Sequence, residues 1–433
     1  MSPLIISSLG VIFFLILVSQ SVPISFSFAI VGFLGLFFLR GFESGLFILG
    51  NAPYTWSSAQ ALIPMPLFIL MGNLASYAGI GTGLYAAANK WVGRFPGGLA
   101  LATTLACTGF SACSGSSMAG AATMCTIAYP EMRKFKYNDR LSTACIAAGG
   151  TIAVLIPPSG AFIMYGFLTG TSIAKLFIAG ILPGLLLCSL FMVLIFIMCK
   201  LNPELGPAAM SYSLKEMIIS LKGIWGVLLL FFLIVVGLYF GVFTPSEAGS
   251  IGAFGAFIIT IIRRRFTWSG FFNATKDSLR ITCFIFTLTI GAMVFNTFMS
   301  VSGLTVVLSS WVKGLPLSPY VILIVILLIY IPLGMVMDVL AMLVLTMQVV
   351  FPIVVDLGFD PVWFGILITV MSEMALVTPP VGLNVYLVSG VTNVGIEEVF
   401  RGILPFFIMM VVCVVILIAF PQISLFLPTM MSG

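Results

Sequence analysis

Apolar segments long enough to cross a lipid bilayer follow one another along nearly the whole chain. They cover residues 4–18, 23–39, 62–77, 141–168 and 172–199, then residues 224–239, 245–262, 281–298, 361–389 and 394–420. A helix of about 20 apolar residues spans the hydrocarbon core. Most of the separating stretches are short, and none is a polar run long enough to bury a core of its own. The pattern therefore predicts an all-α polytopic membrane protein.

The second half of the chain repeats the first. Pro157 and Pro158 match Pro379 and Pro380 at a separation of 222 residues, and the same offset aligns GILP at 180–183 with GILP at 402–405. Self-similarity at one fixed spacing indicates duplicated structural units. We predict two repeats, residues 1–222 and 223–433, in which the segments within 4–80 and 224–298 form a scaffold.

Each repeat contains an apolar stretch with a polar centre, at residues 97–131 and 317–353. Two full crossings need roughly 40 residues plus a turn. The first stretch is shorter, so it predicts a re-entrant hairpin with its tip at residues 111–117. The corresponding tip in the second repeat lies at residues 332–338. Residues 83–96 and 303–316 form a further matching pair of amphipathic stretches.

Each repeat also contains a long apolar run with a Pro-Pro pair and a glycine in its middle, at residues 141–168 and 361–389. Proline removes a backbone donor and collides with the preceding helical turn. Inside a bilayer, the freed backbone groups persist only where protein or a water-filled cavity covers them. A pair of interrupted helices in corresponding halves indicates the binding site of a transporter.

Loop charge predicts the orientation of the two hairpins. Basic residues follow the first hairpin, whereas its copy is followed by acidic ones, and positively charged loops stay in the cytoplasm. The first hairpin should open to the cytoplasm and the second to the opposite side, which makes the repeats inverted. Both chain ends then lie outside. The residues that carry this argument are Arg133, Lys134, Lys136 and Arg140, against Asp356 and Asp360, with Arg263–Arg265, Lys276 and Arg280 marking a second cytoplasmic loop.

Composition narrows the function classes. The chain is 61% hydrophobic and 7% charged, with a net charge of +5 from loop residues, so it gives no reason to expect nucleic-acid binding. It has no histidine, its eight cysteines form no CxxC pair, and no phosphate-binding loop is present. The chain therefore lacks the usual ligand patterns of zinc and haem and the usual base of a catalytic triad. We expect no enzyme, and an intramembrane hydrolase is the weaker reading.

The candidate chemistry lies at the two tips and the two breaks. Carbonyls near Gly115, Pro157, Gly334 and Pro379, joined by neighbouring hydroxyl groups, suit Na⁺, and helix N-termini suit an anion. A serine taken singly is better explained by helix packing. Clustered at a repeated break, the serines favour binding. The intramembrane acids Asp338 and Glu373 are functional candidates, with pairing at the membrane rim as the alternative.

Five segments resemble the large membrane subunit of the tripartite ATP-independent periplasmic (TRAP) transporters, and the likeness covers essentially the whole chain. They are GFSACSGSSMAGAAT (109–123), AAGGTIAVLIPPSG (147–160), LFIAGILPGLLL (176–187), IPLGMVMDVLAMLVLTM (331–347) and VTPPVGLNVYL (377–387). The chain departs from many relatives at Gln348 and at position 373.

The resemblance implies an elevator-type importer of the bacterial inner membrane, driven by Na⁺ and needing no organic cofactor. Its partners would be the lipid bilayer, a small four-helix membrane subunit and a periplasmic solute-binding protein. That protein would deliver an organic anion, such as sialic acid or a C4-dicarboxylate. Because no small-subunit segment precedes Met1, we expect the partner to be a separate chain.

The resemblance also implies two Na⁺ sites with the substrate between them. The implied Na⁺ ligands are Ser114, Gly115, Ser116, Ser117 and Pro157 at one site, and Gly334, Asp338, Thr378 and Pro379 at the other. We expect the substrate to contact polar and break residues of both halves, which are Ser111, Thr151, Ser159, Glu373, Pro380, Gly382 and Asn384.

Two alternatives stay open. A stand-alone Na⁺-coupled dicarboxylate carrier on the same inverted-repeat plan would work without partner proteins. A non-transporting membrane scaffold would leave the repeated polar tips without a reason.

Overall fold

The computed structural model describes residues 2–208 and 212–431, which fold into helices without any β-strand among them. Six helices of this part of the chain are long and apolar enough to cross a membrane, or up to seven if the bent pair Leu214–Leu221 and Trp225–Tyr239 is one span. Several further apolar helices are shorter. The prediction of an all-α, multi-pass membrane protein is confirmed.

The first half runs from an N-terminal helical hairpin to a long apolar helix. Its elements are α1 (Pro3–Ser19), α2 (Ile24–Arg40), α3 (Phe42–Ser57), η1 (Gln60–Leu62), α4 (Pro64–Tyr77), α5 (Ile80–Val92), α6 (Gly98–Ser114), α7 (Ser117–Lys134), α8 (Asp139–Thr151), η2 (Ile152–Val154), α9 (Gly160–Thr169), α10 (Ile173–Leu201) and η3 (Pro203–Leu205).

The second half has nearly the same order of elements. They are α11 (Leu214–Leu221), α12 (Trp225–Tyr239), α13 (Pro245–Ile262), α14 (Trp268–Ser302), α15 (Leu304–Lys313), α16 (Pro319–Gly334), α17 (Val339–Asp356), α18 (Pro361–Ala375), α19 (Leu383–Thr392), α20 (Ile396–Ala419) and α21 (Gln422–Thr429). Helices α6–α7 and α16–α17 occupy the ranges expected for the hairpins, and α8–α9 and α18–α19 those expected for the broken helices.

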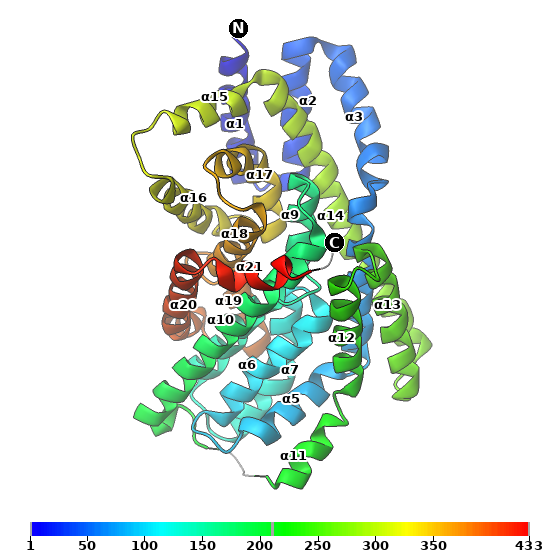
Figure 1. Ribbon diagram of the computed structural model, residues 1–433, viewed down its shortest axis with the longest axis vertical. Coiled ribbons are helices and arrows are strands. Elements are labelled where there is room, and N and C mark those ends of the chain that lie inside the picture. Colours follow the sequence, from blue (N-terminus) through cyan, green and yellow to red (C-terminus); the bar gives the residue numbers. More distant parts are fainter. Residues whose placement is uncertain (1, 209–211, 432–433) are drawn as a thin grey trace.

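Helices of the two halves pack against each other in the part expected to be the scaffold. Helix α2 packs along α14, α4 packs along α13, and α3 also contacts α14 (Figure 1). Where α1, α2 and α14 meet, the rings of Phe14 and Phe28 stack, and the Phe295 ring packs against both at a tilt. Contacts between α2 and α14 are close, because a methyl group on Gly32 would lie 2.6 Å from the Phe295 nitrogen.

Helices α8 and α18 are the most enclosed elements of the fold. Every residue from Leu141 to Thr151 and from Val362 to Ala375 is buried. A helix that is buried on all sides lies inside a bundle rather than on its surface. Each of these helices leads into a Pro-Pro break, and the first of the two breaks is buried as well, at Pro157 and Pro158.

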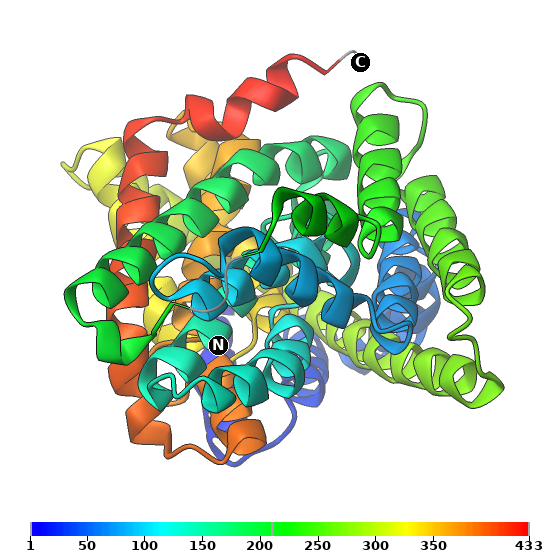
Figure 2. The same cartoon turned by 90° about the horizontal axis from the view of Figure 1, so that it is seen from below.

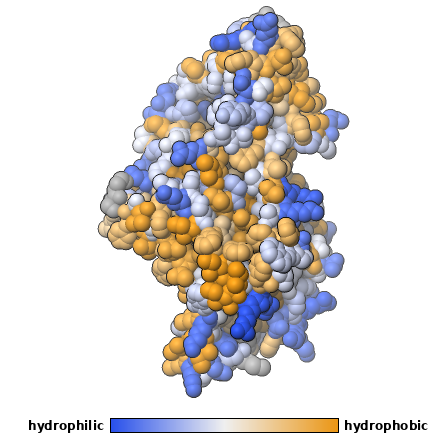
Figure 3. Space-filling view, turned by 90° about the vertical axis from the view of Figure 1, so that its right-hand side faces the viewer, coloured by the Kyte–Doolittle hydropathy of each residue, from blue (hydrophilic) through white to orange (hydrophobic). Residues whose placement is uncertain are grey.

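Apolar side chains cover much of the outside of the molecule. Figure 3 shows one such face, where hydrophobic residues form broad areas and hydrophilic residues gather in smaller groups. Large apolar or aromatic side chains there and elsewhere are highly exposed, including Phe47 at 71% and Leu201 at 75%. Contiguous exposed apolar surface of this extent marks a membrane contact.

One prediction about the scaffold is wrong. The scaffold segment expected to begin at residue 281 is part of α14, which begins at Trp268, so Lys276 and Arg280 lie on a helix and not in a loop. Residues 42–57, which belong to none of the predicted apolar segments, form helix α3, and this helix continues through Pro53. Helix α21 beyond residue 420 was not predicted at all.

Candidate functional site

The tip of the first hairpin reverses the chain within two residues. Helix α6 ends at Ser114, Gly115 takes a left-handed conformation with φ +58°, and Ser116 caps α7 by accepting a hydrogen bond from the Ala119 nitrogen at 3.4 Å. Serine is a favoured residue at this position because its side chain satisfies a free amide of the first turn. Helix α7 therefore has its N-terminus at the tip.

The first break lies against this tip. Helix α8 ends at Thr151, the Pro157–Pro158 peptide bond is cis, and Ser159 caps α9 by accepting from the Phe162 nitrogen at 3.3 Å. A methyl group on Gly115 would lie 2.4 Å from the Pro158 carbonyl oxygen. Tip and break thus touch through their backbones.

The second tip has the same plan with a different capping residue. Helix α16 ends at Gly334, and the Asp338 carboxylate caps α17 by accepting from the Leu340 nitrogen at 3.2 Å. A methyl group on Gly334 would lie 2.3 Å from the Cβ of Ala375, the last residue of α18. This tip therefore lies against the start of the second break.

The second break turns through a left-handed glycine. The Pro379–Pro380 bond is cis, Gly382 has φ +52°, and α19 begins at Leu383. The backbone nitrogen of Asn384 donates to the Leu376 carbonyl at 3.2 Å, which holds the start of α19 against the end of α18. Pro157 and Pro158 are buried, whereas Pro379 and Pro380 are exposed, so the second break is the more open one.

Helices of the first half contact helices of the second half at these tips and breaks. Helix α7 of the first hairpin packs against α19, and α17 of the second hairpin packs against α9. Figure 2 shows the first of these pairs, with the teal ribbon of α7 beside the orange ribbon of α19. Glu373 of α18 lies beside the hydroxyl of Ser117, the first residue of α7. The structure therefore brings the predicted residues of both halves into one region.

Several buried polar atoms in this region have no hydrogen-bond partner among the described residues. They are the Ser114 and Ser372 hydroxyls, both Glu373 carboxylate oxygens, and both polar atoms of the Asn384 amide. Glu373 is 1% exposed and Asn384 0%. Leaving such a group unpaired costs about 1–3 kcal/mol. Unpaired buried polar atoms of this kind are suited to contact a bound cation or polar ligand.

Other predicted site residues bond to their own helices. The hydroxyls of Ser111, Thr151 and Thr378 donate to the carbonyls of Cys107, Ala148 and Met374 at 2.7, 2.6 and 2.7 Å. Each hydroxyl oxygen keeps lone pairs that can still accept a hydrogen bond or contact a cation. Hydrogen bonds of this kind, from a side-chain hydroxyl to a carbonyl of the preceding helical turn, are common for serine and threonine in membrane helices.

Sequence reasoning missed Ser372, whose hydroxyl is buried and unpaired within the described chain. It is a single serine in an apolar run, so no pattern distinguishes it. Gln348 also has an unpaired buried oxygen there. It was noticed only as a departure from the resembling family, although an amide in the middle of an apolar helix is itself a signal.

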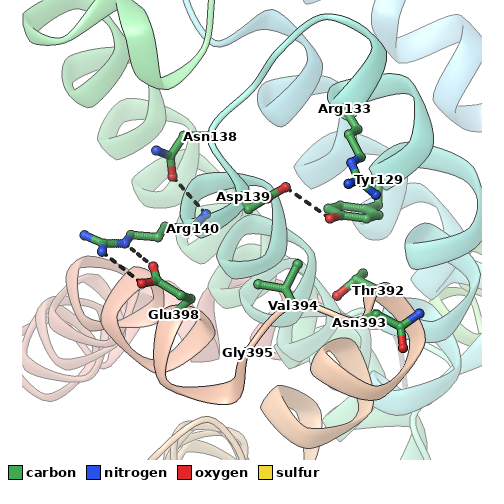
Figure 4. Close-up of a pocket in the computed structure, with 10 residues that line it drawn as sticks. All are labelled: Tyr129, Arg133, Asn138, Asp139, Arg140, Thr392, Asn393, Val394, Gly395 and Glu398. Atoms are coloured by element: carbon green, nitrogen blue, oxygen red, sulfur yellow. Dashed lines mark hydrogen bonds and ion pairs between the residues drawn. The ribbon is translucent and has the colours of Figure 1, made fainter.

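One cavity lies away from the tips and breaks. It has a volume of about 830 Å³ and opens between the base of the first hairpin and the α19–α20 turn (Figure 4). Arg140 pairs with Glu398 there through two hydrogen bonds, one of them 3.0 Å from Nη2 to Oε1. The Tyr129 hydroxyl donates to Asp139 at 3.0 Å. This cavity contains none of the predicted site residues.

Comparison with known proteins identifies the family. The family model "Tripartite ATP-independent periplasmic transporter, DctM component" matches residues 11–423. The chain belongs to this family. It is therefore a large permease component of a TRAP transporter, and its relatives are permeases and not enzymes. The match spans both hairpins and both breaks.

Three curated relatives share about a third of their residues with this TRAP permease. The C4-dicarboxylate permease DctM of Pseudomonas aeruginosa is 36% identical over 86% of this chain and 87% of its own length. The sialic acid permease SiaM of Vibrio cholerae is 32% identical over the same shares. The 2,3-diketo-L-gulonate permease YiaN of Escherichia coli is 30% identical over 94% and 95%.

Two solved structures share the fold. The YdaH transporter of Alcanivorax borkumensis superposes with a TM-score of 0.61 at 13% identity, over 90% of this chain and 88% of that one. MtrF of Neisseria gonorrhoeae, from a class of antimetabolite efflux pumps, gives 0.59 at 12% identity over 97% and 95%. At these identities the likeness concerns the fold alone.

Proposed function

We propose that this permease is a Na⁺-coupled secondary importer of an organic anion that carries a carboxylate. The observation that carries the proposal is that polar atoms of Ser114, Ser372, Glu373 and Asn384, residues at or near a tip or a break, are buried and unpaired within the described chain. Relatives that transport a C4-dicarboxylate, sialic acid or a diketogulonate have anionic substrates. The substrate here is expected to belong to the same chemical class.

Na⁺ would bind in two places related by the repeat. At the first, hydroxyls and carbonyls of Ser114–Ser117 and the carbonyl of Pro157 supply oxygen ligands. At the second, the Asp338 carboxylate joins Thr378 and the carbonyls of Gly334 and Pro379. Exposed carbonyls at interrupted helix ends are common ligands of coupling Na⁺ ions in transporters. Binding of both ions would hold tips and breaks in the geometry that accepts the substrate.

The anion would bind between these ions. Four helices, α7, α9, α17 and α19, begin at a tip or a break. Helix N-termini carry free amide groups and partial positive charge, so they attract an anion. Ser111, Thr151, Ser159, Glu373, Pro380, Gly382 and Asn384 would line this space. The two Na⁺ charges would offset the charge of a carboxylate taken into the membrane.

Transport would proceed by an elevator movement of two inverted repeats. The exchange of partners between the halves, α7 on α19 and α17 on α9, supports a pseudo-two-fold relation. The hairpins and broken helices would move together against α1, α2, α4, α12, α13 and α14. The difference in exposure between the two breaks supports access from one side at a time.

Two partners complete the proposal. A small four-helix membrane subunit would associate with the scaffold, and a periplasmic solute-binding protein would deliver the substrate. The words "tripartite" and "periplasmic" in the family description support this arrangement and a place in the bacterial inner membrane. The competing reading is a carrier that needs neither partner.

Uptake into proteoliposomes tests the proposal. Vesicles holding this chain and its small partner receive labelled C4-dicarboxylates or sialic acid, with and without the binding protein, under an inward Na⁺ gradient. Uptake that requires both Na⁺ and the binding protein is expected. Uptake by this chain alone would replace the proposal with the self-sufficient carrier, and uptake without Na⁺ would exclude Na⁺ coupling.

A further inference from the structure

A tight turn with three consecutive arginines, Arg263–Arg265, joins α13 to α14. The Arg264 nitrogen donates to the Ile261 carbonyl at 2.9 Å, and Arg264 has the left-handed φ of +54°. The Arg265 nitrogen donates to the Thr260 carbonyl at 3.1 Å. These bonds form a Schellman motif, in which glycine is the usual left-handed residue. The turn itself therefore does not explain why an arginine stands at position 264.

Two guanidinium groups of this turn lie close to each other. Arg263 is partly buried, and its guanidinium donates to the Gly223 carbonyl in the α11–α12 connection. Burial lowers the pKa of Arg263, and the neighbouring positive charge of Arg265 lowers it further. Lys222, next to Gly223 in the chain, adds another exposed base. Like charges in such proximity repel each other, and a bound anion would relieve this repulsion.

Lys222 and Arg263–Arg265, here called the basic cluster, have no acidic partner in the described part of the chain. None of the three ion pairs within residues 2–208 and 212–431 includes a member of the cluster. The nearest acid after the turn, Asp277, accepts from the Tyr77 hydroxyl at 3.1 Å. On α11, the Glu216 carboxylate caps its own helix. The cluster therefore offers its positive charge to a ligand from outside the chain.

Exposed apolar side chains border the basic cluster. Ile261 and Ile262 before the turn and Trp268 and Phe272 after it are all exposed. In Figure 2 the light-green ribbons of α13 and α14 meet at the outer edge of the molecule. Aromatic and basic side chains at the ends of membrane helices are typical of the boundary between hydrocarbon and headgroups. A soluble anion would contact only the bases, whereas a phospholipid can contact both the bases and the apolar border.

A small cavity adjoins the cluster between the end of α4 and the start of α14. Its volume is about 40 Å³, and Arg265, Thr267 and Gly270 are among the residues that line it. This volume exceeds the space that one water molecule needs. The cavity can therefore receive a small polar group of a ligand that is bound at Arg265.

We propose that the basic cluster binds the phosphate of an anionic phospholipid, whose acyl chains lie along the exposed apolar side chains of α13 and α14. Arginine suits this role because its guanidinium can donate two parallel hydrogen bonds to a phosphate. Basic pockets at the cytoplasmic ends of membrane helices bind such headgroups, and loop charge predicts that this turn faces the cytoplasm. The inference goes beyond the proposed function and does not depend on Na⁺ coupling or on the substrate.

Native mass spectrometry of the purified permease in detergent tests the site. Phosphatidylglycerol should bind at least tenfold more tightly than phosphatidylcholine with the same acyl chains. The double variant Arg264→Gln and Arg265→Gln should bind phosphatidylglycerol at least tenfold more weakly than the wild type. The matched control is Arg133→Gln with Lys134→Gln, which removes the same charge from an exposed helix end of α7. This control should bind the lipid as the wild type does.

A second pair of substitutions separates lost charge from lost structure. Arg264→Lys with Arg265→Lys keeps both charges and should bind phosphatidylglycerol within threefold of the wild type. A loss as large as that of the glutamine variant would contradict the proposal, because charge would then not be what the lipid recognises. If the double glutamine variant does not fold, Arg265→Gln alone takes its place, with an expected loss of at least threefold.

Three further results would overturn the lipid site. The first is equal binding of the two phospholipids by the wild type, and the second is unchanged binding in the glutamine variant. The third is displacement of phosphatidylglycerol by an equal concentration of inorganic phosphate, which would assign the cluster to a soluble anion. A glutamine variant that binds the lipid normally but no longer copurifies with the small subunit would assign this surface to that subunit.

Discussion

Gly115 at the tip of the first hairpin is in backbone contact with Pro158 of the first break. A methyl group at Gly115 would lie 2.4 Å from the Pro158 carbonyl oxygen, and the residue has φ +58°. The left-handed conformation alone costs a residue other than glycine about 1–2 kcal/mol. The contact adds a clash with backbone, which cannot move aside as a flexible side chain would.

Gly115→Ala should therefore reduce Na⁺-driven uptake at least tenfold and lower the unfolding temperature. Gly170→Ala is the matched control, since Gly170 has φ +71° and nothing within 4 Å of its added methyl group. It should show the backbone cost without loss of uptake. Equal effects of the two substitutions would mean that contact between tip and break is unimportant.

The second tip offers a test by exchange of size. Gly334→Ala should impair uptake, because the new methyl group would lie 2.3 Å from the Ala375 Cβ. Combining it with Ala375→Gly removes the opposing methyl group and should restore uptake to a large part of the wild-type rate. Gly390→Ala, with open space around the added methyl group, is the control. A double variant as inactive as the single one would contradict the prediction.

The substitution Asp338→Asn removes the negative charge of this residue but keeps its ability to cap α17. Asparagine is as good an N-cap as aspartate, so α17 should keep its start and the protein its stability. The lost charge should raise the Na⁺ concentration for half-maximal uptake by tenfold or more, which corresponds to about 1.4 kcal/mol or more. Asp356→Asn, at the other end of the same helix and paired with Lys313, should leave the Na⁺ dependence unchanged. An unchanged Na⁺ dependence of Asp338→Asn would remove Asp338 from the ion site.

Tyr137 joins the base of the first hairpin to the connection between the halves. Its hydroxyl donates to the Pro207 carbonyl at 2.7 Å and accepts from the Leu99 nitrogen at 3.1 Å. Burial raises the pKa of Tyr137 to about 12, so it stays neutral at physiological pH. Tyr137→Phe leaves the Leu99 amide unpaired and should cost about 1–3 kcal/mol of unfolding free energy.

Thermal or denaturant unfolding measures this cost. Tyr54→Phe is the control, because Tyr54 is 80% exposed, and it should unfold as the wild type does. No difference between the two variants would show that water replaces the lost hydroxyl.

The sequence predicted the elements that depend on strong local rules. A proline interrupts a helix, so the breaks between α8 and α9 and between α18 and α19 followed from residues 157–158 and 379–380. The start of α14 did not follow, because Lys276 and Arg280 were expected in a loop, although charged residues extend a helix readily once it leaves the hydrocarbon layer.

The sequence indicated which segments contain the candidate site, but not which of their residues contact one another. Glu373 was singled out as an acid inside an apolar run, and Ser117 as one of the serines at the first tip. Neither pattern says that the two residues lie together, because only the packing of helices brings them close. Whether an amide such as Asn384 is paired likewise depends on three-dimensional neighbours.

The length of α14 has a mechanical consequence. Its 35 residues make a rod about 52 Å long, against a hydrocarbon layer about 30 Å thick. Such a rod reaches both headgroup layers or tilts, and its end at Trp268 is 67% exposed. Helices α2, α3 and α4 pack against α14. The thickness of the bilayer should therefore set the tilt of all four helices together. Lipids with shorter acyl chains would increase the tilt of these four helices, and the proposed elevator movement would then run along a tilted surface.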